Sequence, residues 1–488
     1  MHSEKVILQS LQCMSESGLP CLLMVTLALG GGVERHVQEL QAVLKNRAHV
    51  VIVRPHVHAQ QILFTAPLYV MIDGALQAHD VVNLAFKWPQ DSAQMGEWIS
   101  LFGISRVHVH HVLGFPKTFW TYLLKFQLPL DLTLHDHSIF TGNPGLLDEQ
   151  GRFDPSWLDE GLSAMPTGDA QVAWAFRKLA LRAHRVIVPS QALAAAVRKV
   201  FPSLDVLVRN HPEREIDGRY PPVQQYKAST SKPFKVLCLG MLGIEKGAYA
   251  LANTAALVDQ QQLDIEFILL GACHVVLPSS VRCMGLYQDT ELPDLIAGIA
   301  PHLLWLPAQC PETWSYTLSA GLRAGLPVLA SALGALPERL LGRPFTRLIA
   351  HTATAEQWLA TMQQLQVDIS AEHDLQDFEW PQNYCEYFYT EAVNAREGQV
   401  VSAASLCYLQ ATCARVGKIE ILPTRLMSAQ RLALQHAGRW RVLLLRTIYI
   451  VSRWSLVAGL VRYVPYRWQR RLKRAISRAP LDSRTLRK

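Results

Sequence analysis

The stretch CLLMVTLALGGGVERH at positions 21–36 joins a run of apolar residues to three consecutive glycines and then a polar segment. The apolar run predicts a buried strand. Glycines permit a sharp turn and a close approach of the backbone to a ligand, and the free N–H groups of a following helix favour an anion. The stretch therefore predicts a strand, a turn and a helix, and the turn either holds an anion or is only a tight connection. It lacks the G-x-G-x-x-G pattern of nicotinamide dinucleotide sites.

The same alternation of apolar runs with longer helical stretches continues outward from this point. Further runs lie at 48–55, 81–86, 106–112, 130–136 and 185–190, and the pattern begins again at 234–240, 265–271, 281–287, 302–308 and 327–334. Continuous apolar strands that alternate with helices indicate parallel sheets covered by helices on both faces. The sequence therefore predicts two doubly wound α/β domains.

A polar, proline-containing segment at 211–233 separates the two series of strands and is typical of an interdomain linker. We expect a first domain over 18–215 and a second over 233–395. A mainly helical region should follow over 396–488.

Length and composition exclude several classes of protein. The 488 residues are 50% hydrophobic and include twelve Trp, which excludes wholesale disorder and a small disulfide-dependent scaffold. The nine Cys form no C-x-x-C pair and no zinc-type cluster, so we interpret them as reduced thiols of a cytosolic protein. The start, MHSEKVILQS, lacks the apolar stretch of a signal peptide.

The charge is concentrated at the C-terminus. Residues 439–488 carry 14 Lys and Arg against one Asp, a net charge of +13, whereas the whole chain has +7. Three arginines interrupt the apolar segment 442–464, which argues against a membrane span. Beyond Pro465, five arginines fall on one helical face opposite an apolar one: Arg467, Arg470, Arg471, Arg474 and Arg478. This pattern indicates a helix that lies on an anionic membrane, or a solvated face packed on the body. No recognised module supports nucleic-acid binding.

Two motifs with polar side chains follow predicted strands. His135 and Asp136 lie at the end of the run at 130–136, where ligands bind in open α/β sheets. This pair is suited to hydrogen-bond sugar hydroxyls or to influence a proton, or it is satisfied by neighbouring loop groups. We interpret His108, His110 and His111 as structural or cleft-lining residues rather than as metal ligands.

The second half repeats the pattern of strand, glycine turn and helix. Its turn, GMLGIEKG at 240–247, contains Gly240 and places Lys246 where a phosphate would need a cation, unless Lys246 is only a surface residue. The string AQCPETWSYTLS at 308–319 is a hydroxyl-rich loop that leads into a helix. Its hydroxyls and N–H groups suit a phosphate, and Glu312 suits a sugar hydroxyl.

These motifs together resemble those of the GT-B glycosyltransferases, in particular the retaining transferases of glycosyltransferase group 1, or family 4. The matching segments are GGVERH at 31–36, HD at 135–136, VIVPS at 186–190, GIEKG at 243–247, PETWSYTLS at 311–319, AGLPV at 324–328 and LGALPER at 333–339. The segment NPGLLDEQGRF at 143–153 is similar to the branch that builds bacterial surface polysaccharides.

The resemblance implies two Rossmann-like domains that face each other across a cleft, with the nucleotide-sugar on the second and most of the acceptor on the first. It implies catalytic roles for His135, Asp136 and Glu312, of which His135 and Glu312 would contact the sugar. Donor phosphates would be bound by residues of both glycine turns and of the helix start: Gly31, Gly32, Gly240, Lys246, Thr317, Leu318 and Ser319. No metal or other cofactor is expected, and the leaving phosphate would help to deprotonate the acceptor.

The sequence departs from the family pattern at two positions. Ala320 stands where the family has a second Glu that binds the ribose, and Met241 stands near the place of a second basic residue. A degenerate homologue that binds a glycan or a partner protein is therefore an alternative, and a nucleotide-sugar epimerase is another.

We expect a glycosyltransferase that moves a sugar to a lipid-linked or polysaccharide acceptor in bacterial lipopolysaccharide O-antigen or capsule assembly. Residues 439–488 would hold it on the cytoplasmic face of the membrane.

Overall fold

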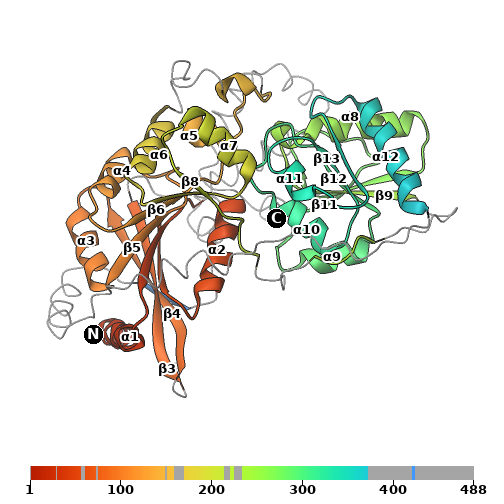
Figure 1. Ribbon diagram of the computed structural model, residues 1–488. Helices are drawn as coiled ribbons and strands as arrows, with labels where there is room; N and C mark the ends of the chain where they lie inside the picture. Colours follow the sequence, from red (N-terminus) through yellow and green to blue (C-terminus); the bar gives the residue numbers. More distant parts are fainter. Residues whose placement is uncertain are drawn as a thin grey trace.

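The protein is described by a computed structural model over residues 2–28, 30–55, 61–72, 75–148, 151–158, 170–213, 220–224, 233–371 and 420–423. Within these ranges the chain forms two α/β domains that lie side by side (Figure 1). The predicted pair of sheets is confirmed. The chain passes from the first sheet to the second between Val208 and Phe234, an interval that contains the predicted linker 211–233.

The first domain is built on a nine-stranded sheet with the order β15-β4-β3-β2-β1-β5-β6-β7-β8. Its strands are β1 (Cys21–Val25), β2 (His49–Pro55), β3 (Gln61–Ile72), β4 (Ala75–Lys87), β5 (Ile104–Val109), β6 (Leu130–Thr133), β7 (Arg185–Val188), β8 (Val206–Val208) and β15 (Glu420–Pro423). The strands from β2 through β1 to β8 are parallel, so their carboxyl ends meet at one edge of the sheet.

One part of this sheet differs from the parallel arrangement that the sequence predicts. Strand β3 pairs antiparallel with β2, β4 pairs antiparallel with β3, and β15 pairs antiparallel with β4. The apolar run at 81–86 is therefore the second arm of a hairpin rather than a parallel strand. Strand β15 also places four residues of the predicted helical region 396–488 in a sheet.

Alternate residues of each central strand pack on opposite faces of the first sheet. Leu23 and Val25 of β1 belong to one large apolar cluster, whereas Leu22 and Met24 pack with helix α2 in another. The helices of this domain are α1 (His2–Ser17), α2 (Gly32–Leu44), α3 (Ser92–Leu101), α4 (Lys117–Leu124), α5 (Ser138–Thr141), α6 (Ala170–Arg182) and α7 (Gln191–Val200), with a 3-10 turn η1 (Pro155–Leu158). Apolar burial on both faces explains why the strand runs are continuously hydrophobic.

The second domain has a six-stranded, fully parallel sheet with the order β11-β10-β9-β12-β13-β14. Its strands are β9 (Phe234–Leu242), β10 (Ile265–Cys273), β11 (Arg282–Gly285), β12 (Leu303–Leu306), β13 (Val328–Ser331) and β14 (Thr346–Ile349). Its helices are α8 (Ala248–Gln260), α9 (Leu292–Ile299), α10 (Tyr316–Arg323), α11 (Leu336–Leu340) and α12 (Ala355–Ser370), with a 3-10 turn η3 (Ile244–Lys246). Helices α8 and α12 cover one face, and α9 and α10 cover the other.

The basic segment 439–488 lies outside the described residues, so its predicted amphipathic helix stays a prediction, as do the domain limits. Among the helices that the structure describes, none combines the length and the apolar character that crossing a bilayer requires.

A buried carboxylate joins three neighbouring strands of the first sheet. Asp131 of β6 is fully buried, and its Oδ1 atom accepts a hydrogen bond of 2.9 Å from Arg106 of β5. Its Oδ2 atom accepts one of 2.7 Å from Arg185 of β7. Burial alone would raise the pKa of Asp131, but the two guanidinium groups outweigh it, and the pKa is lowered. The stabilisation is therefore present above the carboxyl's ordinary pKa and is lost as the pH falls through the lowered pKa.

Removing this charge should destabilise the first domain strongly. Asp131→Asn removes the buried carboxylate that pairs with Arg106 and Arg185, and we expect a loss of about 3–5 kcal/mol in the free energy of unfolding. Asp368→Asn is the control because Asp368 pairs at 2.5 Å with the half-exposed Arg347, and that variant should lose about 1 kcal/mol or less. Urea unfolding followed by circular dichroism measures both, and equal losses would contradict the proposed weight of the Asp131 cluster.

Candidate functional site

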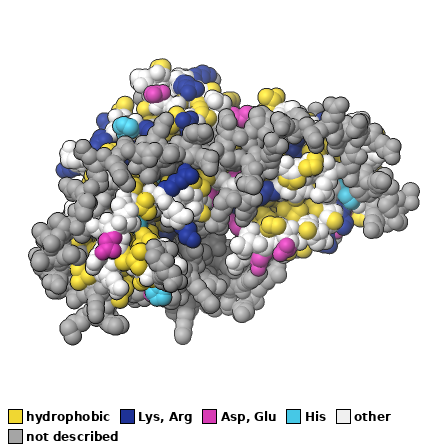
Figure 2. Space-filling view, turned by 60° about the horizontal axis from the view of Figure 1, so that its bottom comes forward, with side chains coloured by type: hydrophobic (Ala, Val, Ile, Leu, Met, Phe, Trp, Pro, Cys, Tyr) yellow, Lys and Arg dark blue, Asp and Glu magenta, His cyan; other side chains and the backbone are white. Residues whose placement is uncertain are grey.

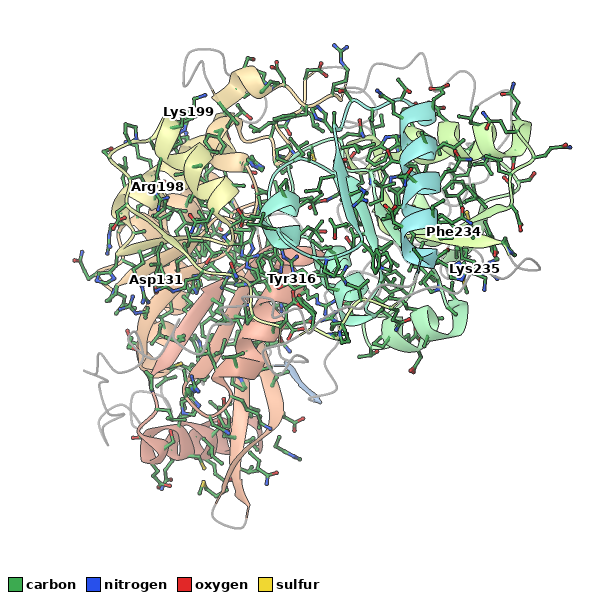
Figure 3. The ribbon with its side chains drawn as sticks, turned by 45° about the vertical axis from the view of Figure 1, so that its right-hand side comes forward. Asp131, Arg198, Lys199, Phe234, Lys235 and Tyr316 are labelled. Atoms are coloured by element: carbon green, nitrogen blue, oxygen red, sulfur yellow. The ribbon has the colours of Figure 1, made fainter. Side chains whose placement is uncertain are left out.

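The candidate site lies where the carboxyl edge of the first sheet meets the second domain. In Figure 3, Tyr316 at the start of α10 lies at this junction, whereas Asp131 lies within the first domain. On the face shown in Figure 2, basic and acidic side chains lie among hydrophobic and other polar ones on the described part of the surface. Ligands of open α/β sheets bind at such strand ends.

The glycine turn after β1 faces the second domain. Gly30 and Gly31 have positive φ angles of 74° and 80°, which glycine adopts at little cost. A Cβ atom on Gly32 would lie 3.8 Å from the ring of Tyr316. One turn later, the Arg35 guanidinium lies 4.8 Å from the centre of that ring. Gly32 thus lies at the junction, and the contact of Gly31 and Gly32 with a ligand stays a prediction.

His135 and Asp136 follow β6 and have different surroundings. The His135 carbonyl accepts a hydrogen bond of 2.6 Å from the Thr313 hydroxyl of the second domain, and its Nε2 atom lies 3.2 Å from His110 Nδ1. Asp136 Oδ2 lies 3.1 Å from His111 Nε2, and its Oδ1 accepts the Ser138 N–H. Burial would raise the pKa of Asp136, but these hydrogen bonds and the His111 charge lower it to about 2. Asp136 is thus a fixed anion beside the imidazoles.

His135 belongs to a group of buried imidazoles from separate segments. His36 lies near the start of α2, His110 follows β5 and His211 follows β8. The ring centre of His36 lies 4.7 Å from that of His135 and 4.2 Å from that of His211. Burial lowers the pKa of His36 to about 3, and it lowers those of His110, His135 and His211 well below the ordinary range. The group is therefore uncharged at neutral pH.

In the second domain, Lys246 and Glu312 form an ion pair across the ends of β9 and β12. The Lys246 side chain is 42% exposed and that of Glu312 is 15% exposed, so the pair remains open to a ligand. Burial acts to lower the pKa of Lys246, but the charge of Glu312 outweighs it, and the pKa is raised. Lys246 is therefore a permanent cation, as a phosphate site requires.

The start of α10 lies beside this pair. A Cβ atom on Gly240, whose φ is +93°, would lie 3.4 Å from Thr317 Cγ2, so these two predicted donor-binding residues face each other. The Leu318 N–H donates a hydrogen bond of 3.3 Å to the Ser315 hydroxyl. The Ser315 hydroxyl oxygen also lies 3.0 Å from that of Thr317. The structure thus brings Gly240, Lys246, Glu312, Thr317 and Leu318 to one end of the second sheet.

Ser319 lies apart from them, in a buried network around Glu213. The fully buried Glu213 carboxylate accepts hydrogen bonds from the Ser319 hydroxyl and from Trp314 Nε1, and it pairs with Arg323 at 3.3 Å. Arg339 stacks 3.7 Å above the Trp314 ring and donates to Ser319 Oγ at 3.0 Å. The predicted contact of Ser319 with a donor stays a prediction, and in this structure its hydroxyl is engaged within the protein.

The structure also places the two departures from the family pattern. Ala320 is 4% exposed in the apolar cluster under α10, and Met241 is 63% exposed. Glu338 accepts the N–H groups of Gln191 and Ala192 at 3.0 and 2.8 Å and so joins the domains at α7. Glu213 is too deeply buried to replace a ribose-binding carboxylate.

Several residues of the site were not predicted from the sequence. Glu213 falls in the polar linker, where an acid is ordinary, and His36 lies in a motif chosen for its glycines. His110 was interpreted from the HVHH pattern at 108–111 as a structural or cleft-lining residue, but its partners come from distant segments and were not predicted.

Solved structures with this architecture include sucrose-phosphate synthase from Thermosynechococcus elongatus, with a TM-score of 0.50 and 14% identity over 87% of this chain and 99% of that chain. The protein has the GT-B fold. HepE from Anabaena in complex with UDP is also similar, with a TM-score of 0.45 and 14% identity over 81% of this chain and 100% of that chain. A glycosyltransferase from Rickettsia africae has a TM-score of 0.44 and 13% identity over 72% of this chain and 91% of that chain. No protein-family model matches the sequence, and no curated protein matches it.

The turn that carries Lys246 should depend on Gly247. Its φ is +88°, and a Cβ atom there would lie 2.1 Å from the carbonyl oxygen of Pro307. Gly247→Ala should therefore lower the free energy of unfolding of the second domain by at least about 2 kcal/mol. Gly298→Ala in α9 is the control because nothing lies within 4 Å of its Cβ position. Thermal melting that shows equal stability for both variants would contradict the proposed constraint.

Proposed function

We propose that this protein is a glycosyltransferase that moves a sugar, with retention of configuration, from a nucleotide-sugar to a lipid-linked or polysaccharide acceptor. The Lys246–Glu312 pair at the domain junction of a GT-B fold is the observation that carries this proposal. Lys246 is a permanent cation suited to the diphosphate of a nucleotide-sugar, and Glu312 is a carboxylate suited to the hydroxyls of its sugar. Both side chains are open to a ligand.

The diphosphate of the donor would bind at the start of α10. Lys246 supplies the positive charge there. Thr317, which faces Gly240, supplies a hydroxyl. A helix start adds partial positive charge of its own. On the opposite side, Gly31 and Gly32 leave room for the phosphates to approach the first domain.

The transferred sugar would lie between Glu312 and His135. Their segments are held together by the hydrogen bond from Thr313, the neighbour of Glu312, to the His135 carbonyl. A neutral imidazole and a carboxylate are suited to hydrogen-bond sugar hydroxyls without adding charge near the breaking bond. Asp136 would hold the His135 segment through its bonds to His111 and Ser138.

As the glycosidic bond to the donor breaks, negative charge grows on the departing phosphate. Lys246 and the backbone N–H groups near it are fixed before the reaction, so they stabilise this charge with little reorganisation. A departing phosphate oxygen would accept the proton of the attacking acceptor hydroxyl. In this mechanism Lys246, rather than a metal ion, would neutralise the charge of the departing phosphate.

The acceptor class and the location rest on the family resemblance and on the basic C-terminus. Assembly of bacterial lipopolysaccharide O-antigen or capsule presents lipid-linked glycans at the cytoplasmic face of the membrane. Residues 439–488, with their net charge of +13, would bind the anionic lipids there.

A degenerate GT-B homologue that binds a glycan or a partner protein is the alternative. The apolar surroundings of Ala320 favour it because this helix position offers no carboxylate to a ribose. Binding of a nucleotide diphosphate separates the two functions.

Replacing Lys246 should weaken nucleotide binding. We expect Lys246→Ala to reduce the affinity for UDP, GDP or ADP, whichever stabilises the native protein against heating, by about 10- to 100-fold because the phosphates lose a charged partner. Isothermal titration calorimetry measures the change. Lys178→Ala, on the exposed face of α6, is the control and should bind normally. Unchanged affinity in Lys246→Ala would contradict the donor site, and failure of all three nucleotides to stabilise the protein would favour the binding-protein alternative.

Neutralising the basic tail should release the protein from membranes. The variant replaces five arginines by glutamine: Arg467, Arg470, Arg471, Arg474 and Arg478. It should lose most of its binding to vesicles that contain anionic lipid. Co-sedimentation with anionic and with neutral vesicles measures the effect. Equal sedimentation of the variant and the native protein with anionic vesicles would show that these charges are not the anchor.

A further inference from the structure

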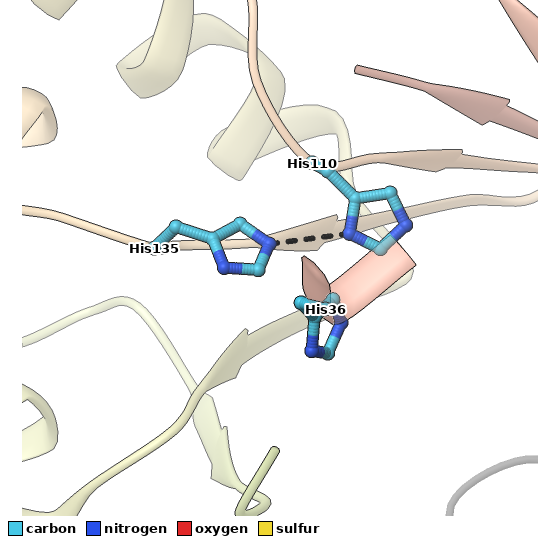
Figure 4. A group of neighbouring side chains, drawn as sticks. All are labelled: His36, His110 and His135. Atoms are coloured by element: carbon cyan, nitrogen blue, oxygen red, sulfur yellow. Dashed lines mark hydrogen bonds between the residues drawn. The ribbon is translucent and has the colours of Figure 1, made fainter. Parts of the chain in front are cut away.

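Three buried histidines of the first domain converge on one point at the carboxyl edge of its sheet. Their side chains come from the start of α2, the end of β5 and the end of β6, and they surround a common space: His36, His110 and His135 (Figure 4). One ring nitrogen of each lies within 4.8 Å of one ring nitrogen of both others. All three residues are at most 8% exposed.

The separations are close to those of nitrogen ligands on one ion. His110 Nδ1 and His135 Nε2 lie 3.2 Å apart. Two nitrogens bound at about 2.0–2.1 Å to a tetrahedral zinc ion are ~3.3 Å from each other. The other separations are at most 4.8 Å, so His36 would have to move by up to about 1.5 Å to reach the tetrahedral spacing.

The group is incompletely hydrogen-bonded. Within the part of the chain that the structure describes, both ring nitrogens of His36 and the Nε2 atom of His110 are buried without a hydrogen-bond partner, whereas His110 Nδ1 and His135 Nε2 are paired with each other. A buried polar atom without a partner costs about 1–3 kcal/mol. His36 therefore has a lone pair free for a metal ion beside the paired His110 and His135 nitrogens.

The ligand set selects the class of ion. Neutral imidazole favours zinc, copper, nickel and cobalt, whereas magnesium and calcium require oxygen ligands. Three histidines also leave one coordination position open, as in sites that keep a water or a substrate atom on zinc. The ring of His211, 4.2 Å from that of His36 and 5.0 Å from that of His135, forms an adjacent wall.

We propose that His36, His110 and His135 form a binding site for a divalent transition-metal ion, with Zn²⁺ as the best match. When the ion binds, it replaces the hydrogen bond between His110 and His135. The ring that donated this bond moves its proton to its other nitrogen, so no net proton is released. The ion would share His135 with the proposed sugar site and would engage only the Nε2 atom of that ring.

The test measures metal uptake directly, with protein that carries no histidine tag. The three variants are His36→Gln, His110→Gln and His49→Gln. They and the native chain are dialysed against Zn²⁺ and then analysed for bound metal. His49→Gln is the matched control because His49 is an equally buried histidine at the beginning of β2, on the opposite edge of the sheet, where it bonds to Ser17. His135 is left intact because it belongs to the proposed sugar site.

We expect one tightly bound Zn²⁺ in the native protein and in His49→Gln. The affinity should fall at least tenfold in His36→Gln and in His110→Gln. With Co²⁺ in place of Zn²⁺, the native protein should show the visible absorption of a four-coordinate cobalt ion, and X-ray absorption of the zinc form should show imidazole nitrogens in the first shell. These spectra require no variant, so they test the site even if a substitution disturbs folding.

Two results would overturn the proposal. The first is no stoichiometric metal in the folded native protein. The second is native-like uptake in both His36→Gln and His110→Gln, which would place the metal elsewhere among the 18 histidines. Because metal alone is the probe, neither result depends on whether the protein binds a nucleotide-sugar.

Discussion

The buried carboxylate of Glu213 joins the segment that leaves the first domain to the helix and loop that form the second domain's part of the site. It is fully shielded from water and is neutralised by Arg323 and Arg339. Its hydrogen bonds to Trp314 and Ser319 fix the loop at 311–319 and the start of α10. A buried charge without such partners would cost several kcal/mol, so these groups have to keep their arrangement together.

The position of the site follows from that arrangement. The fixed loop presents Glu312 to Lys246 on one side and Thr313 to the His135 carbonyl on the other. Groups that would contact phosphate and sugar are thus connected to both sheets through a few hydrogen bonds. Arg35, which stacks on Tyr316, adds a contact from the first glycine turn.

The periodicity of the sequence was sufficient to predict the parallel part of the fold. Runs such as 234–240 and 265–271 are buried on both faces of the sheet, and their continuous apolar character reflects that burial. The hairpin of β3 and β4 was not predicted because its run at 81–86 is equally apolar, and periodicity does not distinguish the direction of a strand. Strand β8 was missed because three residues leave too short a pattern.

The site was predictable where residues follow a strand directly in the sequence, as for Lys246 and His135. It was not predictable where distant segments meet. His36 and His110 approach each other only because β1 and β5 are neighbours in the sheet, an order that the sequence does not display. Glu213 likewise gains its importance from arginines more than a hundred residues away.

The contact between Glu338 and α7 has a consequence for how the sequence can drift. The carboxylate holds the other domain through the N–H groups of residues 191 and 192, which almost every amino acid provides. Substitutions at these two positions would therefore leave the connection intact, with proline as the exception because it has no N–H. At this contact the evolutionary constraint falls on Glu338 alone, so residues 191 and 192 can change while the contact is kept.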